Sequence, residues 1–83
     1  MANETHINVT LDFTNWMEGT YDLRIPRHQT VKQLLLNLQE TLSIQLPGLA
    51  RFAIKVPTKQ LVLADDDSLL DYPVADGDIL IVL

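Results

Sequence analysis

The sequence has no cysteine, few basic residues and no long hydrophobic segment. The absence of cysteine excludes disulfides, thiolate metal sites and thiol nucleophiles together. Lys and Arg number 6 against 11 Asp and Glu, and the net charge of -5 opposes binding to nucleic acid or to an anionic membrane. The longest hydrophobic runs, at 34–36 and 79–83, are too short to cross a bilayer. We therefore expect neither a nucleic-acid partner nor direct membrane insertion.

The hydrophobic residues in the sequence are enough for the chain to fold through side-chain packing alone, without disulfides. Hydrophobic residues make up 47% of the chain, a fraction typical of a folded protein rather than a disordered one. Its 83 residues leave room for one domain, which we expect to span residues 1–83. The first six residues have neither the basic nor the apolar region of an export signal. We expect a cytoplasmic protein.

Hydrophobic periodicity predicts a β-hairpin at the start of the chain. Hydrophobic and polar residues alternate over 6–13 and again over 20–25, a period of two that is typical of strands with one buried face. The segment 14–19 between them ends in Gly19 and predicts the hairpin loop. Pro26 should stop the second strand, because proline cannot donate to a ladder.

The period changes to that of a helix after Thr30. Thr30 is a good N-cap, and Gln33 lies where a capping box requires it. The residues at helical spacing form one apolar stripe, which consists of Val31, Leu34, Leu35, Leu38 and Leu42. Leu36 lies off that stripe. The helix should end near Leu42 or Ser43, before the loop signalled by Pro47-Gly48.

The second half of the chain predicts three short strands and one helical turn. Residues 51–56 alternate as a third strand, and 61–64 form a fourth. Asp65-Asp66-Asp67 is expected to be a solvated loop, and 68–71 a tight helical turn. That turn should pack through Leu69, Leu70 and Tyr72. After the Asp76-Gly77 turn, the last strand should direct Ile79, Ile81 and Leu83 inward.

This order of elements predicts an α+β fold. The first and last strands are the most apolar, so they should lie side by side at the centre of the sheet, in parallel. One helix packed across one face of a mixed sheet makes a two-layer fold. That is the β-grasp, or ubiquitin-like, arrangement.

Particular segments carry a closer resemblance. Lys59-Gln60-Leu61 and Ser68-Leu69-Leu70-Asp71-Tyr72 resemble ubiquitin. Three other segments more specifically resemble the family of YukD and EsaB. They are Leu11-Asp12-Phe13-Thr14-Asn15, Gly19-Thr20-Tyr21-Asp22-Leu23 and Asp76-Gly77-Asp78-Ile79-Leu80. Members of this family are small ubiquitin-like proteins encoded with the type VII secretion systems of Gram-positive bacteria.

The resemblance implies a cytoplasmic, non-enzymatic accessory protein that supports or regulates export. Its implied partners are the cytosolic parts of the motor ATPase or of a bitopic membrane component, which would bring it to the inner face of the membrane. One alternative is a soluble regulatory protein of the secretion locus without stable membrane docking. Another is a ubiquitin-like modifier or sulfur carrier, which would need a Gly-Gly tail where this sequence stops at Ile81-Val82-Leu83.

The residues themselves indicate no catalytic, cofactor or metal site. A calcium loop counted from Asp65 would need Gly at Leu70 and Glu at Asp76, and the pattern fails. His6 and His28 lie in no ligand-spaced motif, and we expect both to be solvated. We therefore expect no cofactor, and expect the acidic loops at most to steer a basic partner.

The remaining candidate is a partner-binding surface on the sheet face opposite the helix. We expect strand three to project Ala53 and Lys55 there and strand five to project Leu80 and Val82. Trp16 and Met17 offer large hydrophobic side chains at the hairpin tip, and such residues are enriched among interface anchors. The alternative to an exposed Trp16 is that its side chain folds back onto the sheet and covers Leu80. Open strand edges also allow self-association.

Overall fold

The chain begins with the predicted hairpin. In the computed structural model, which describes residues 5–44 and 52–83, β1 (His6–Asp12) pairs antiparallel with β2 (Thr20–Pro26). The short 3-10 turn η1 (Thr14–Trp16) joins them, and Met17 ends this turn in the left-handed region at φ 62°. Phe13 follows β1 directly and is fully buried. The alternation along both strands therefore predicted the hairpin correctly.

The helix α1 (Val31–Leu42) begins and ends where the sequence predicts. The Thr30 hydroxyl accepts a hydrogen bond from the Gln33 N–H, and the Gln33 side chain accepts one from the Thr30 N–H, both at 3.1 Å. This capping box satisfies N–H groups that have no partner within the helix. Ser43 ends the helix in the left-handed region at φ 54°. The loop predicted at Pro47-Gly48 lies outside the described residues.

A second hairpin follows the helix. β3 (Ala53–Val56) and β4 (Leu61–Ala64) pair antiparallel, and the 3-10 turn η2 (Pro57–Lys59) joins them. Both strands are confirmed over these residues. Arg51, which the alternation places at the start of the third strand, lies outside the described residues.

The chain closes with a helical turn and a strand, η3 (Leu69–Asp71) and β5 (Ile79–Val82). The predicted turn is confirmed, and the Ser68 hydroxyl caps it by accepting a hydrogen bond from the Leu70 N–H. Leu69 is fully buried, whereas Leu70 is 46% exposed. The expected packing through Leu70 is wrong, because successive residues of a 3-10 turn point about a third of a turn apart.

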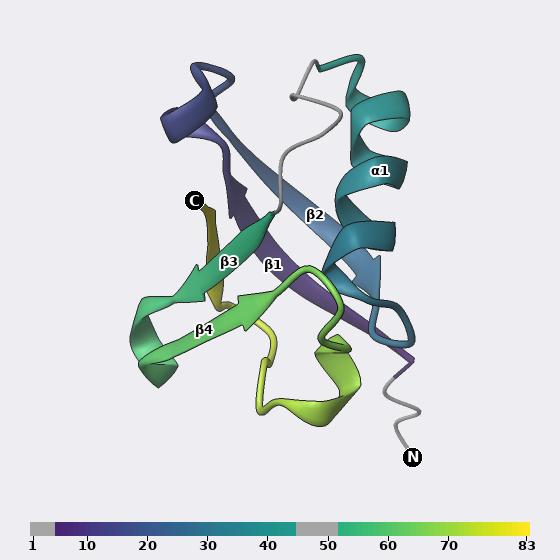
Figure 1. Ribbon diagram of the computed structural model, residues 1–83, viewed down its shortest axis with the longest axis vertical. Coiled ribbons are helices and arrows are strands. Elements are labelled where there is room, and N and C mark those ends of the chain that lie inside the picture. The colour runs from purple at the N-terminus through teal and green to yellow at the C-terminus, as the bar shows by residue number, and fades with distance from the viewer. Residues whose placement is uncertain (1–4, 45–51) are drawn as a thin grey trace.

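The five strands form one mixed sheet in the order β2-β1-β5-β3-β4. β1 and β5 are neighbours at its centre and run parallel, while the other pairs are antiparallel. Helix α1 lies on one face of this sheet (Figure 1). Parallel neighbours cannot be joined by a tight turn, and here the helix and the second hairpin make the crossover. This is the predicted β-grasp arrangement.

The hydrophobic core lies between the sheet and α1. Its members come from all five strands, the helix, η3 and the connecting segments: Ile7, Val9, Leu11, Phe13, Ile25, Val31, Leu34, Leu35, Leu38, Ile44, Phe52, Ile54, Val56, Leu63, Leu69, Val74, Leu80 and Val82. Leu42 is partly buried against them, and Leu36 is 46% exposed. The apolar stripe of the helix is therefore confirmed, with Leu36 outside it.

Candidate interaction surface

The face of the sheet opposite α1 carries a group of exposed hydrophobic side chains. Val62 is 61% exposed, Ile79 42% and Leu83 43%. Ile81 on β5 lies opposite Lys55 on β3, and Lys55 lies opposite Val62 on β4. We call these side chains and their small neighbour on β3 the apolar outer patch, which consists of Ala53, Val62, Ile79, Ile81 and Leu83.

The orientation predicted for the last strand is wrong. Leu80 and Val82 are fully buried in the core, and Ile79 and Leu83 face outward instead. The run 79–83 is hydrophobic at every position, so it has no alternation from which to decide which residues face the core. Leu80 and Val82 are therefore not part of an exposed surface, while Ala53 and Lys55 do lie on the predicted face.

Backbone pairing with β1 decides the orientation of β5. The Gly77 N–H donates to the Asn8 carbonyl at 2.8 Å, and the Thr10 N–H donates to the Asp78 carbonyl at 3.0 Å. Gly77 makes this approach at φ 89°, a left-handed conformation that favours glycine. The pairing places Leu80 beside the buried Leu11.

The Asp78 side chain holds this turn in place. Its carboxylate accepts hydrogen bonds from the Ala75 N–H at 2.9 Å and the Thr58 hydroxyl at 3.0 Å, and it pairs with the Lys59 ammonium at 3.2 Å. Burial by itself raises the pKa of Asp78. The hydrogen bonds and the Lys59 charge outweigh burial and hold the pKa below its ordinary value of 3.8. Asp78 is thus a charged, fully partnered side chain with a structural role.

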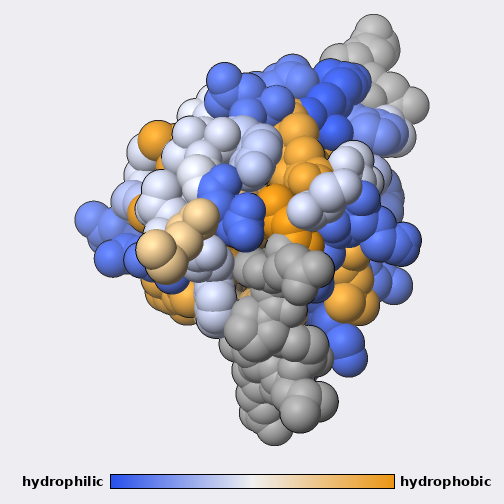
Figure 2. Space-filling model, turned by 90° about the horizontal axis from the view of Figure 1, so that it is seen from above, coloured by the Kyte–Doolittle hydropathy of each residue, from blue (hydrophilic) through white to orange (hydrophobic). Residues whose placement is uncertain are grey.

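The two residues predicted at the hairpin tip point to different places. The Trp16 ring is partly buried and packs edge-on against Phe52, with ring centroids 6.3 Å apart. Trp16 therefore folds back onto the protein. Met17 is 93% exposed. At this end of the molecule a hydrophobic band breaks an otherwise mostly hydrophilic surface (Figure 2).

The hairpin tip lies beside the end of the apolar outer patch. The Asn15 amide donates to the Val82 carbonyl at 3.2 Å, which ties η1 to the last residues of β5. Figure 1 shows the same proximity between the tip and the C-terminal end of the chain. Met17 directly follows η1, so the hairpin tip that carries it lies near this end of the sheet, and its role in binding stays a prediction.

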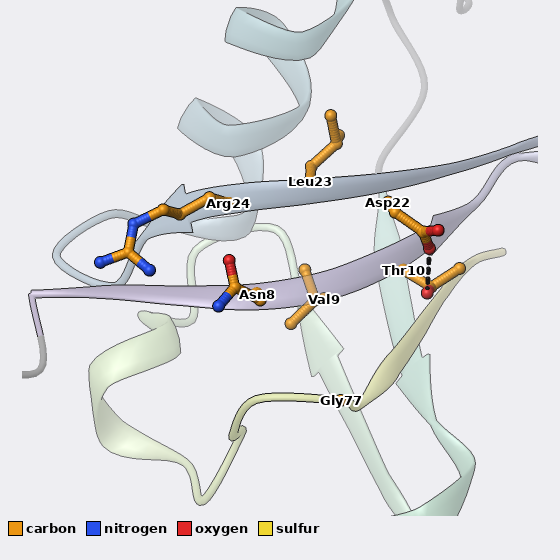
Figure 3. Close-up of a pocket in the computed structure, with 7 residues that line it drawn as sticks. All are labelled: Asn8, Val9, Thr10, Asp22, Leu23, Arg24 and Gly77. Atoms are coloured by element: carbon orange, nitrogen blue, oxygen red, sulfur yellow. Dashed lines mark hydrogen bonds between the residues drawn. The ribbon is translucent and has the colours of Figure 1, made fainter.

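The other half of the outer face is polar. Asn8 and Thr10 of β1 lie opposite Arg24 and Asp22 of β2, and these four residues form what we call the polar outer half. With Gly77 they line an open depression of about 340 Å³ (Figure 3). The Thr10 hydroxyl donates to the Asp22 carboxylate at 2.7 Å. The depression is shallow and holds no convergent set of catalytic groups among its lining residues.

The other titratable side chains considered in the sequence are either exposed or hydrogen-bonded to the backbone. His6 and His28 are exposed, as predicted. Asp67, expected to be only solvated, accepts a hydrogen bond from the Ala64 N–H at 2.8 Å, so the acidic loop also closes β4. Within residues 5–44 and 52–83, no three His, Asp or Glu side chains cluster as metal ligands would. In the same part of the chain, no helix has the length and hydrophobicity needed to cross a membrane.

Sequence reasoning missed Val62, Ile79, Ile81 and Leu83 as surface residues. The predicted central placement of the first and last strands implied that β1 and β5 pair, but not in which register. The observed register, with Thr10 opposite Ile79 and Leu11 opposite Leu80, sets which face each residue of β5 occupies. Val62 stands in the hydrophobic run Leu61-Val62-Leu63-Ala64, where no polar residue marks the outer face.

Comparisons with known proteins agree with this geometry. Residues 6–82 match the family described as "WXG100 protein secretion system (Wss), protein YukD". The type VII secretion system accessory factor EsaB of Staphylococcus aureus (strain Newman) is 44% identical over 78 residues, which cover 94% of this chain and 96% of the relative.

Solved structures show the same fold at low sequence identity. The ubiquitin-like domain of an Arabidopsis thaliana protein is similar with a TM-score of 0.69 at 20% identity, over 100% of this chain and 81% of that one. A chain of the structure described as "MycP5-free ESX-5 inner membrane complex" is similar with a TM-score of 0.60 at 20% identity, over 95% of this chain and 21% of that one. With its β-grasp fold and this family match over nearly its whole length, the chain belongs to the YukD family.

Proposed function

We propose that this chain is a non-enzymatic, cytoplasmic accessory protein of a type VII secretion system, which docks to a membrane component of that system. Its membership of the YukD family and its 44% identity to the accessory factor EsaB support the assignment to secretion. The manner of action has to be argued from the surface, because a ubiquitin-like fold hosts many functions.

The observation that carries the docking proposal is the apolar outer patch. Large hydrophobic side chains of two strands lie on one side of the sheet: Val62 on β4 and Ile79 on β5 are exposed, and Ile81 on β5 is partly exposed. Exposed hydrophobic surface of this kind marks interaction sites, because burying it against a partner removes it from water. The exposed Lys55 lies within the patch, where its aliphatic stem can pack while its ammonium stays at the rim.

The partner we propose is the cytosolic part of the motor ATPase or of a bitopic secretion component. A hydrophobic patch with a basic residue inside it fits a hydrophobic partner surface that carries an acidic side chain. The presence of a similar fold in a chain of the ESX-5 inner membrane complex supports contact between this fold and an inner-membrane secretion assembly.

The test is affinity capture from detergent-solubilised native cells, with tagged wild type compared with Ile81→Asp and Val62→Asp. Captured secretion ATPase and bitopic component are quantified by mass spectrometry. We expect each substitution to reduce their recovery about tenfold or more, because a charge in the centre of a buried contact is strongly unfavourable.

Leu36→Asp is the matched control. It introduces the same charge at an exposed leucine on α1, which matches the exposed Val62, away from the patch, and should leave recovery unchanged. Circular dichroism and thermal unfolding establish that each variant is folded. If wild type captures no membrane component, docking is abandoned in favour of a soluble regulator. If all folded variants capture the ATPase equally, the patch is not the docking site.

A further inference from the structure

We infer that two copies of this chain pair through the edge strand β2, antiparallel and centred on Leu23, so that Asp22 of each copy lies opposite Arg24 of the other. The inference concerns a surface separate from the apolar outer patch, and it is independent of the docking proposal. It rests on the backbone groups that β2 leaves open and on the order of the charges along the strand.

The hydrogen bonds of β1 show which backbone groups of β2 are open. Arg27 donates to the Thr5 carbonyl at 2.9 Å, and Phe13 donates to the Gly19 carbonyl at 2.8 Å. Bonded and non-bonded pairs alternate in an antiparallel ladder, so the residues of β2 bonded to β1 are those at odd positions. The N–H and C=O groups of Asp22 and Arg24 therefore point away from β1, toward the open edge of the sheet.

The two edges of the sheet differ in how well they are closed. On β4, the Ala64 N–H is already taken by the Asp67 carboxylate, and the strand is only four residues long. The β2 edge runs over seven residues, and no backbone hydrogen bond from Asp22 or Arg24 to a residue outside the sheet is found within the described chain. Pro26 ends β2 and limits the pairing to the residues before it. An open edge of this kind is a template for a further strand.

The charges along β2 favour a second copy of the chain as the pairing strand, and they determine the register of the pairing. Pairing centred on Leu23 opposes Asp22 and Arg24 twice, with opposite charges facing each other, and each such pair exchanges both of its backbone bonds. Pairing centred on Asp22 would oppose Asp22 to itself, and pairing centred on Arg24 would oppose Arg24 to itself. Only the register centred on Leu23 is self-complementary.

The side chains are available for this contact. Arg24 is exposed and makes no ion pair within the described residues, and Asp22 uses only one carboxylate oxygen, to accept the Thr10 hydroxyl (Figure 3). Leu23 points to the other face and is only partly buried. In the paired register the two Leu23 residues are directly opposite in a non-bonded pair, where side chains approach closely, so each covers the exposed part of the other.

The test is sedimentation of the full chain in physiological salt, from about 10 µM to about 1 mM, because a short strand contact forms a weak interface. We expect wild type to dimerise within this range. Asp22→Arg and Arg24→Asp should each weaken self-association about tenfold or more, since like charges then face each other twice. An equal mixture of the two single variants should restore association as a heterodimer, and the exchanged double variant D22R/R24D should restore it as a homodimer.

Matched controls separate pairing from net charge. Asp66→Arg changes the net charge from -5 to -3, as Asp22→Arg does, and Lys32→Asp changes it from -5 to -7, as Arg24→Asp does. Both control positions are exposed and away from β2. If general repulsion governed association, Asp22→Arg and Asp66→Arg would both strengthen it.

Three outcomes would overturn the inference. These are a wild type that stays monomeric up to about 1 mM, single variants that behave like their charge-matched controls, and a mixture that does not associate. Thermal unfolding of each variant shows whether a loss reflects pairing or folding.

Discussion

The two halves of the outer sheet face were built by different sequence patterns, and they offer different chemistry. On the β1–β2 half, polar residues alternate with hydrophobic ones, and the exposed side chains are hydrogen-bonded or charged, as Thr10 and Asp22 are. On the β5–β3–β4 half, runs such as 79–83 are hydrophobic at successive positions, so hydrophobic side chains reach the surface whichever way the strand turns. The alternating pattern suits strand pairing in one specific register, and the uniformly hydrophobic pattern leaves hydrophobic side chains exposed on the sheet face.

Neighbouring residues of β5 should give the largest contrast. Leu80→Ala should lower the free energy of unfolding by about 2–5 kcal/mol, because it leaves a cavity at a fully buried site. Ile79→Ala should cost less than about 1 kcal/mol, because much of its side chain is already in water. Urea unfolding of both variants checks the contrast. A larger cost for Ile79→Ala than for Leu80→Ala would mean that β5 presents the other face to the core, and equal costs would contradict the difference in burial.

Asp78→Asn should have the next largest effect. The amide cannot match the carboxylate as an acceptor for Ala75, Thr58 and Lys59, and we expect a loss of about 1–3 kcal/mol at pH 7. Thermal unfolding measures it. A neutral result would mean that the turn before β5 is held by its backbone bonds alone.

The pH dependence of the same variant has a definite sign. The pKa of Asp78 is lowered in the folded protein, from its ordinary value of 3.8. The stability that it contributes is therefore present above that value and is lost as the pH falls through the folded pKa. The difference in stability between wild type and Asp78→Asn should thus narrow below about pH 4. A constant difference from pH 7 to pH 3 would contradict the charged role of Asp78.

The smallest effect should come from the polar outer half. Thr10→Val removes the hydrogen bond to Asp22, but water replaces the lost partner at this exposed site, and we expect a change of about 0.5 kcal/mol or less. Chemical unfolding checks it. A large loss would show that the polar half contributes to folding as the core does.

The elements that could be predicted from the sequence are those that a single stretch of chain specifies by itself. The Thr30–Gln33 capping box and the helical stripe specify α1 from one stretch of chain. The alternation over residues 6–13 likewise specifies β1 with its buried face. Of the predicted partner-binding residues, Ala53, Lys55 and Met17 lie at the surface, Trp16 is partly buried, and Leu80 and Val82 are in the core. Their role in binding remains a prediction.

The sequence alone determined the order of elements, the β-grasp arrangement and the family, because these depend on periodicity, caps and motifs that are local in the chain. Only the tertiary structure decided which side chains of β5 face outward, since a strand that is hydrophobic at every position has no alternation to indicate its buried face. Backbone bonds from Gly77 and Thr10 to partners far away in sequence made that decision. They place Leu80 in the core and leave Ile79 and Ile81 on the outer face.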